Sequence, residues 1–364
     1  MTQSTTFRGN TYSTGSWIPE RPSTGSANPL NELPNNRVTH PLTSLARKLR
    51  ESELFNSLML RSFRALQSVG INITPNHFYW PIPDISELEK REWPSSMGTF
   101  SFDFHFERQL KMLRRMSAEY GVEWSAFADR PLNGSGLYHH NNGFFEMVDA
   151  EIAYAFVRDR KPARIIEIGT GFSTRVMAAA LRMNQQRDGV SGELISIDPM
   201  PERVPQNGFS QSVTVIPSRI QDVDLNLFQS LGEDDILFID SSHVVSVGSD
   251  VVREYLEILP SLHSGVIVHI HDIFLPSDYP REAVLHNMCF WSEQYLLQAF
   301  LSFNNSFEVL WASSAMQAYY PEALEEAFPR WATSFEDMPK AAGRWVPSQD
   351  DKRVWPSSLW IRRV

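Results

Sequence analysis

The spacing of hydrophobic and polar residues changes along this chain, and the change predicts a helical first part followed by an alternating second part. Apolar side chains recur every three or four residues over 44–69, as on one face of a helix, and Gly70 follows as a stop signal. The same spacing predicts a helix over 104–120, with Gly121 beyond its end, and another over 145–159.

From residue 164 onward, short apolar runs of strand length alternate with helical patterns. Such alternation predicts an α/β protein with a doubly wound, mostly parallel sheet. The predicted strands are 164–168, 193–197, 213–216, 236–239, 266–270, 307–312 and 358–361, with the last placed at an edge of the sheet. The predicted helices between them are about 173–186, 249–259 and one long helix over 281–302.

The chain before residue 141 is expected to form two regions outside this sheet. Residues 1–42 are rich in Ser, Thr, Asn, Pro and Gly and show no periodicity, which is typical of a disordered segment. Residues 43–140 are expected to form a mainly helical N-terminal cap. The helix over 44–69 is a candidate element for a homodimer, with a membrane-surface helix as the alternative. Residues 141–364 are expected to form the catalytic domain.

Composition narrows the classes of partner. The 364 residues include 33 basic and 43 acidic ones, and the net charge of −10 comes without a basic block, so nucleic acid is not an expected partner. No apolar run reaches the about 20 residues of a membrane span. The single cysteine, Cys289, suits a reducing compartment, and we expect a cytoplasmic protein.

A glycine turn follows the first predicted strand. Gly169, Thr170 and Gly171 form the turn, and Ser173 stands where the next helix begins. A strand, turn and helix in this order leave free backbone N–H groups and a positive helix end at the top of a sheet, which favours a cofactor there. Thr174 occupies the place of the third glycine of dinucleotide-binding turns, which disfavours a nicotinamide cofactor.

Polar residues follow each of the next four predicted strands. Asp198 ends the second, Gln221 and Asp222 follow the third, Asp240 ends the fourth, and His271 and Asp272 follow the fifth. Ligands in open α/β sheets bind outside the carboxyl ends of the strands, so these residues are predicted to lie together. His243 comes three residues after Asp240 and is expected in the same place.

The pattern E-x-G-x-G-x-S-T over 167–174 resembles the first motif of class I S-adenosylmethionine (SAM)-dependent methyltransferases. The resemblance covers about 145–364. It implies a Rossmann-like, seven-stranded sheet whose last strand is antiparallel. It also implies that Asp198 binds the ribose of SAM. The other implied SAM-binding residues are Glu167 and Gly169 at the methionine end, Thr170, Gly171 and Ser173 in the same turn and helix start, and Gln221 and Asp222 at the adenine.

Two carboxylates beside a sulfonium, Asp240 and Asp272, suggest a divalent cation, because like charges at short range repel. The arrangement resembles the metal-dependent O-methyltransferases of the catechol and macrolide-sugar types. In those enzymes the fifth strand is followed by an acid and Asp or by Asp and Asn. His271 departs from that pattern, because it stands at the first position of the pair. The expected metal ligands are therefore Asp240, His271 and Asp272, and an imidazole ligand moves the metal preference from Mg²⁺ toward Mn²⁺, Fe²⁺ or Zn²⁺.

The resemblance implies a SAM-dependent methyltransferase that acts on a hydroxyl of a small-molecule acceptor. His243 occupies the place of a lysine base in the catechol-type enzymes, and either His243 or His271 could accept the hydroxyl proton. The segment 271–280, with Trp291, is expected to wall the acceptor pocket. The alternatives are a metal-dependent oxygenase like cephalosporin hydroxylase and a SAM-binding partner without catalytic activity.

Overall fold

The computed structural model describes residues 62–74, 76, 80–93, 100–131, 136–201, 213–333 and 354–364. The chain divides into two compact units, 1–75 and 76–364. In the first unit, residues 62–67 are helical and a turn ends at Gly70, where φ is +82° and the predicted helix was expected to stop. The polar segment 1–42 and most of the candidate dimer helix lie outside the described residues.

The second unit is built on a seven-stranded sheet with the order β3-β2-β1-β4-β5-β7-β6. Strands β1 to β5 are parallel, and β7 runs antiparallel to both of its neighbours, as expected for the fold. The strands are β1 (Arg164–Ile168), β2 (Glu193–Ile197), β3 (Val213–Ile216), β4 (Ile236–Ile239), β5 (Ile267–Ile270), β6 (Phe307–Ala312) and β7 (Leu359–Arg363).

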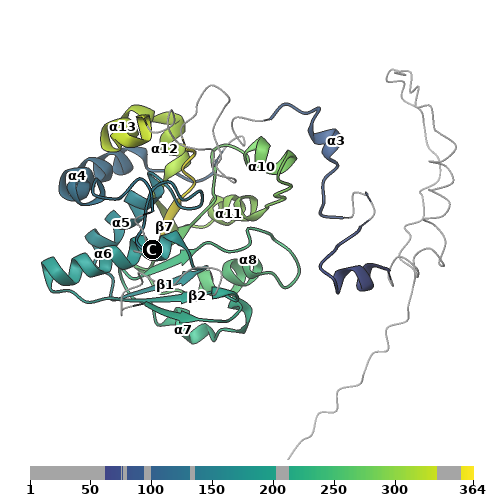
Figure 1. The fold of residues 1–364 in the computed structure, drawn as a ribbon, viewed down its shortest axis with the longest axis horizontal. Helices are drawn as coiled ribbons and strands as arrows, with labels where there is room; N and C mark the ends of the chain where they lie inside the picture. The colour runs from purple at the N-terminus through teal and green to yellow at the C-terminus, as the bar shows by residue number, and fades with distance from the viewer. Residues whose placement is uncertain are drawn as a thin grey trace, which may run out of the picture. The chain divides into compact units, whose positions relative to one another are not determined.

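Strand β7 lies inside the sheet, so its predicted edge position is wrong. It pairs with β5 on one side and with β6 on the other, and Figure 1 shows it as the yellow strand within the sheet. Leu359, Trp360 and Ile361 are all buried. A continuous apolar run is typical of a strand covered on both faces, which an inner strand is and an edge strand need not be.

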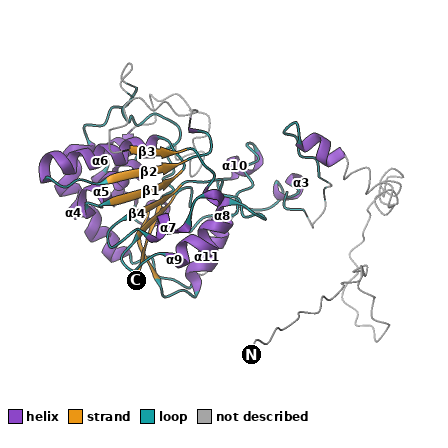
Figure 2. Cartoon of the chain, turned by 90° about the horizontal axis from the view of Figure 1, so that it is seen from below, coloured by secondary structure: helices purple, strands orange, loops and turns teal. Residues whose placement is uncertain are grey.

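Helices cover both faces of the sheet, and each face has its own apolar core. Figure 2 shows α4, α5 and α6 together on one side and α8, α9 and α11 on the other. The helices are α3 (Ile85–Leu88), α4 (Phe106–Trp124), α5 (Asp149–Arg160), α6 (Phe172–Asp188), η2 (Ile220–Asp222), α7 (Leu225–Gln229), α8 (Asp250–Arg253), π-helix η3 (Glu254–Ile258), α9 (Leu259–Ser261), α10 (Arg281–Leu285), α11 (Glu293–Ser302), α12 (Ser313–Tyr319), α13 (Pro321–Ala327) and α14 (Pro329–Thr333).

Helix α4 continues through Gly121, where the sequence predicted its end. The buried side chains Leu113, Met116, Tyr120 and Trp124 form one stripe at steps of three and four residues. Burial of the Trp124 indole offsets the ~1 kcal/mol that glycine costs inside a helix. Helix α4 packs on α5, and both helices belong to the unit 76–364. The boundary near residue 140 between a cap and a catalytic domain stays a prediction.

The single long helix predicted over 281–302 is also wrong, because the structure has two helices, α10 and α11, joined by residues 286–292. Met288 in this connection has φ +56°, which no α-helix accommodates. The break turns the chain so that Ser292 and Glu293 reach the loop after β4. Among the described helices, none combines the length and apolar character needed to cross a membrane.

Candidate active site

The turn after β1 brings the main chain of neighbouring strand ends into contact. Gly169 has φ +96°, and a Cβ atom there would lie 2.4 Å from the backbone oxygen of Asp240. Only glycine fits this position, because a side chain would clash and strain the backbone. The Gly169 N–H donates to the Ile197 carbonyl at 2.9 Å, so the turn is fixed against β2 as well as β4.

Glu167, expected at the methionine end of SAM, is buried beneath the turn. Its two carboxylate oxygens accept hydrogen bonds from Ser173 Oγ at 2.6 Å and Thr174 Oγ1 at 2.7 Å. The Gly171 N–H donates to Thr174 Oγ1 at 2.9 Å. Burial raises the pKa of Glu167 to about 7. This residue therefore anchors the start of α6, and it is not among the residues that line the two cavities described below.

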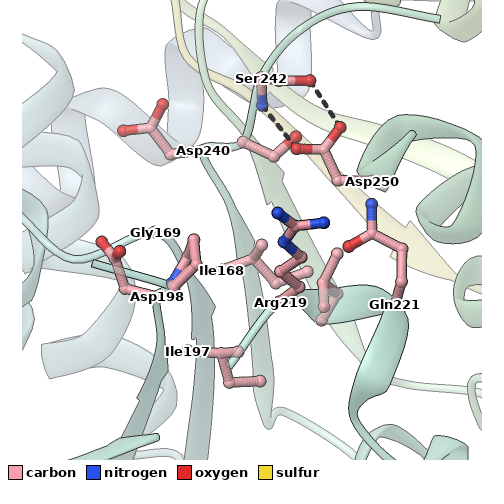
Figure 3. A pocket seen from close by; sticks show the side chains of 12 residues that line it. Ile168, Gly169, Ile197, Asp198, Arg219, Gln221, Asp240, Ser242 and Asp250 are labelled. Atoms are coloured by element: carbon pink, nitrogen blue, oxygen red, sulfur yellow. Dashed lines mark hydrogen bonds between the residues drawn. The ribbon is translucent and has the colours of Figure 1, made fainter. Parts of the chain in front are cut away.

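The carboxyl ends of β1, β2, β3 and β4 surround a cavity of about 370 Å³, which we call the first cavity. Figure 3 shows its labelled side chains, with Asp198 and Asp240 on one side and Gln221 and Asp250 on the other. The lining residues are Ile168, Gly169, Ile197, Asp198, Pro199, Arg219, Ile220, Gln221, Asp240, Ser241, Ser242 and Asp250. Three of the predicted SAM-binding residues, Gly169, Asp198 and Gln221, are among them.

Asp198 is fixed by the backbone around it. Its Oδ2 accepts a hydrogen bond from Thr170 N–H at 3.1 Å, and its Oδ1 accepts one from Met200 N–H at 2.7 Å. Each carboxylate oxygen has a further lone pair, so the side chain can still accept from two ligand hydroxyls. Asp222, the other predicted acid on this side, lies in η2 and does not line the cavity.

A second cavity of about 250 Å³ lies beside the first, and Asp240 lines both. Its walls combine three aromatic side chains with carboxylates and one imidazole. The lining residues are Gly143, Phe144, Glu146, Asp149, Asp240, His271, Asp272, Trp291, Val354, Trp355 and Ser357. Trp291 and His271 were predicted for this wall, whereas Phe144, Asp149 and Trp355 come from segments whose sequence carries no signal for it.

Asp240, His243 and Asp272 form a cluster whose ligand atoms lie within 4.8 Å of one another. His243 Nε2 is 3.4 Å from Asp240 Oδ1 and 3.5 Å from Asp272 Oδ2. His271, the predicted third ligand, lies close by, with its Nδ1 3.5 Å from Asp240 Oδ1 and its Nε2 3.8 Å from Asp149 Oδ2. One imidazole and two carboxylates suit a divalent transition metal, so the residues fit the metal that the sequence implies, with His243 in the ligand set.

Electrostatics in this cluster favour positive charge. Burial disfavours the charged form of His271, but Asp272 and Asp240 outweigh it and raise the pKa of His271 to about 9. The pKa of His243 also rises against burial, because Asp240, Glu293 and Asp272 surround it. Burial opposes ionisation of Asp240 too, yet the two imidazoles hold its pKa far below the usual range. The carboxylates are thus balanced by protonated imidazoles, and a metal ion bound to them would compete with the proton of His243.

Glu293 contacts His243 and was not predicted as a site residue. Its Oε2 lies 2.8 Å from His243 Nδ1, and its side chain is fully buried. The two residues are 50 positions apart, and the sequence around Glu293 indicates only a helix. No local pattern in that stretch distinguishes an acid that faces a histidine from one on a solvated helix face.

Comparison with known proteins gives similarity to methyltransferases. Residues 166–273 match a family described as a methyltransferase domain. An uncharacterized protein of Archaeoglobus fulgidus is 32% identical over 184 residues, with 48% of this chain and 81% of that protein covered.

Two solved structures are similar at low identity. The SAH-bound methyltransferase PaMTH1 of Podospora anserina is 17% identical, with a TM-score of 0.34 and coverage of 55% of this chain and 82% of that one. CmcI, in a D160 form with Mg and SAM, is 14% identical, with a TM-score of 0.28 and coverage of 60% and 72%. At such identities, roles of individual residues follow only from the geometry of this chain.

Proposed function

We propose that this chain, whose residues 166–273 match a methyltransferase domain, is a class I SAM-dependent methyltransferase that methylates a hydroxyl oxygen of a small molecule with help from a divalent metal. The observation that carries the proposal is the position of Asp240, which lines both cavities. A donor in the first cavity and an acceptor in the second would meet at this residue.

The first cavity supports SAM binding through Asp198 and the Gly169 turn. The Asp198 carboxylate, held by two backbone N–H groups, would accept the two ribose hydroxyls. At Gly169 the absence of a Cβ lets a ligand approach the main chain. SAM supplies a methyl group already activated by its positive sulfur, so the protein mainly has to position the acceptor.

The second cavity supports a small, flat acceptor. Phe144, Trp291 and Trp355 provide aromatic surfaces, and Trp355 is fixed by a hydrogen bond from its Nε1 to Ser314 Oγ at 2.7 Å. His271 lines this cavity and His243 does not. We therefore assign the proton-accepting role to His271 and a metal-holding role to His243, together with Asp240 and Asp272. With a pKa of about 9 the His271 imidazole is protonated at neutral pH in the metal-free site, and a cation held by the neighbouring carboxylates would lower this pKa and free the ring to accept a proton. A divalent ion there would orient the hydroxyl and lower its pKa.

The test is methyl transfer from labelled SAM to a panel of phenols, catechols and hydroxylated sugars, with Mn²⁺, Mg²⁺ or a chelator. We expect label on an acceptor oxygen, and we expect the chelator to suppress it. Asp198→Asn should weaken SAM binding by about 10- to 100-fold, since a hydrogen bond to a charged group contributes about 1.5–3 kcal/mol. SAM binding without transfer to any acceptor in the panel would favour a non-catalytic partner.

A metal-dependent oxygenase is the second candidate, and the imidazole of His243 in the ligand set is the observation that favours it. Sites that combine histidine and carboxylate ligands with open positions are typical of non-haem iron oxygenases. Oxygen consumption with Fe²⁺ and the same panel, with no methyl transfer, would support this function over the first.

A further inference from the structure

Residues at the N-terminal end of α11 contact the backbone of His243, its ring and the loop that follows it. The backbone N–H groups of Ser292 and Glu293 both donate to the His243 carbonyl, at 2.8 and 3.1 Å. The Trp291 ring packs against the imidazole, with ring centroids 5.0 Å apart. The Val245 N–H donates to Ser292 Oγ at 2.8 Å, so the loop after His243 is fixed to the same helix start.

These contacts hold His243 in an unusual backbone conformation. Its φ is +60°, in the left-handed region that residues other than glycine adopt only at a cost of about 1–3 kcal/mol. Such a conformation persists where surrounding contacts fix it. The contacts to α11 meet that condition, because they engage the carbonyl, the ring and the next residues of the loop together.

The Glu293 carboxylate has a defined set of partners. Its Oε2 lies 2.8 Å from His243 Nδ1, and its Oε1 accepts a hydrogen bond from the Tyr255 hydroxyl at 3.1 Å. It is the first residue of a ten-residue helix, where the positive end of the helix dipole stabilises a negative charge. An ionised carboxylate can only accept hydrogen bonds, so the proton between Glu293 and His243 belongs to Nδ1.

We infer that Glu293 is a positioning residue that keeps the proton of His243 on Nδ1 and directs Nε2 toward Asp240 and Asp272. The inference rests on the metal-holding role proposed for His243. The Nε2 distances of 3.4 and 3.5 Å to those carboxylates exceed the ~2.7–3.2 Å of ordinary N–H···O bonds, so neither acid holds Nε2 firmly. Nε2 is the nitrogen that a metal would take, in exchange for the proton that this nitrogen carries when the ring is charged.

Carboxylates that accept from the second nitrogen of a histidine ligand fix its tautomer and raise its basicity. A glutamine at position 293 would present an amide that can donate to Nδ1. That donation would move the proton to Nε2 and block ligation, and in the other orientation of the amide the neutral oxygen would accept more weakly from Nδ1–H than the carboxylate does. The exchange of one oxygen for an NH₂ group preserves size and shape, so the effect on the tautomer is separated from an effect on packing.

The experiment compares Glu293→Gln with Glu254→Gln in the full chain. Glu254 is also a fully buried acid of this region, but it accepts from Ser241 Oγ, and its influence on His243 is through charge and not through a hydrogen bond. We expect Mn²⁺ affinity, measured by calorimetry, to fall about 10- to 100-fold in Glu293→Gln and to stay unchanged in Glu254→Gln. SAM affinity should stay unchanged in both variants. In His243→Ala, adding Glu293→Gln should cause no further loss.

Nuclear magnetic resonance of ¹⁵N-histidine-labelled protein provides a readout that needs no metal. We expect a downfield, slowly exchanging Nδ1–H proton of His243 in the wild type and its loss in Glu293→Gln. A wild type that binds no Mn²⁺ but shows this proton would contradict the metal-assisted function and support the role of Glu293. Unchanged Mn²⁺ affinity in Glu293→Gln, or a bare Nδ1 in the wild type, would overturn the inference.

Discussion

At the scale of single residues, we propose that the two histidines beside Asp240 have different roles, His271 in proton acceptance and His243 in metal binding. His271 lines the second cavity, whereas His243 faces Asp240 and Asp272 from outside it. The sequence predicts that both histidines lie near the strand ends, but it does not predict which of them accepts the proton. Their spacing from Asp240 and Asp272 does not indicate which ring faces a cavity. The contact with Glu293 supplies the distinction.

We predict that His271→Gln lowers the rate of methyl transfer about 10²- to 10⁴-fold, as removal of a proton acceptor does, and leaves Mn²⁺ affinity close to that of the wild type. His243→Gln should lower Mn²⁺ affinity instead. Initial rates with labelled SAM and calorimetric titration of Mn²⁺ measure the two effects. Equal loss of metal binding in both variants would contradict this division of roles.

Glu167 predicts a pH dependence of stability. Burial raises its pKa to about 7 from an unfolded value of 4.5, so the folded state binds the proton more tightly. The stability that this group contributes is full below pH 4.5 and is lost as the pH rises through 7. Glu167→Gln should remove this loss and raise the free energy of unfolding at pH 8, relative to the wild type, by up to about 3 kcal/mol.

Urea unfolding of both proteins at pH 5 and pH 8 tests this prediction. The difference between the proteins should appear at pH 8 and nearly vanish at pH 5. A constant difference at both values of pH would show that Glu167 stays ionised in the fold.

At the scale of elements, strands were easier to predict than helix ends. The strands of the parallel core are short, continuous apolar runs, and polar residues follow their carboxyl ends, so Asp198, Asp240 and Asp272 could be placed together without coordinates. The extent of α4 depended on burial of Trp124, and the break before α11 depended on contacts with a loop far away in the chain. Tertiary contacts of this kind leave no local pattern.

Two glycines of these elements should respond to alanine in opposite ways. A Cβ at Gly121 would meet only ordinary contacts, the nearest at 3.7 Å from Ser117 Oγ, so Gly121→Ala should stabilise the protein by about 0.5–1 kcal/mol. Gly169→Ala should destabilise it and weaken SAM binding, because its Cβ would meet the Asp240 carbonyl oxygen. Thermal unfolding and SAM calorimetry measure both. A stabilised Gly169→Ala would contradict the close packing of the turn on β4.

At the scale of the whole molecule, the sheet lies between the two apolar cores, and β7 lies between β5 and β6. The Trp360 side chain is fully buried, and its ring stacks on Phe156 with centroids 4.2 Å apart. The predicted fold class and the antiparallel direction of the last strand are confirmed. The position of that strand between β5 and β6 was not predicted, because an apolar run does not indicate which strands it pairs with.

We predict that Trp360→Ala lowers the free energy of unfolding by about 3–5 kcal/mol, as large-to-small changes in a core do. The matched control is Phe303→Ala, because Phe303 is 92% exposed. This substitution should change the free energy of unfolding by no more than about 0.5 kcal/mol. Urea titration measures both. Equal effects of the two substitutions would contradict the inner position of β7.

The inner position of β7 also orders events during synthesis of the chain. Strands β5 and β6 leave the ribosome before β7, yet each needs β7 as its hydrogen-bonding partner. Until residues 359–363 emerge, the nascent sheet has a gap with unpaired backbone on both of its sides. Strand β7 therefore completes the sheet by pairing with both neighbours. Truncation just before residue 359 should leave a chain that aggregates or is degraded, although all the acidic residues of the site are still present.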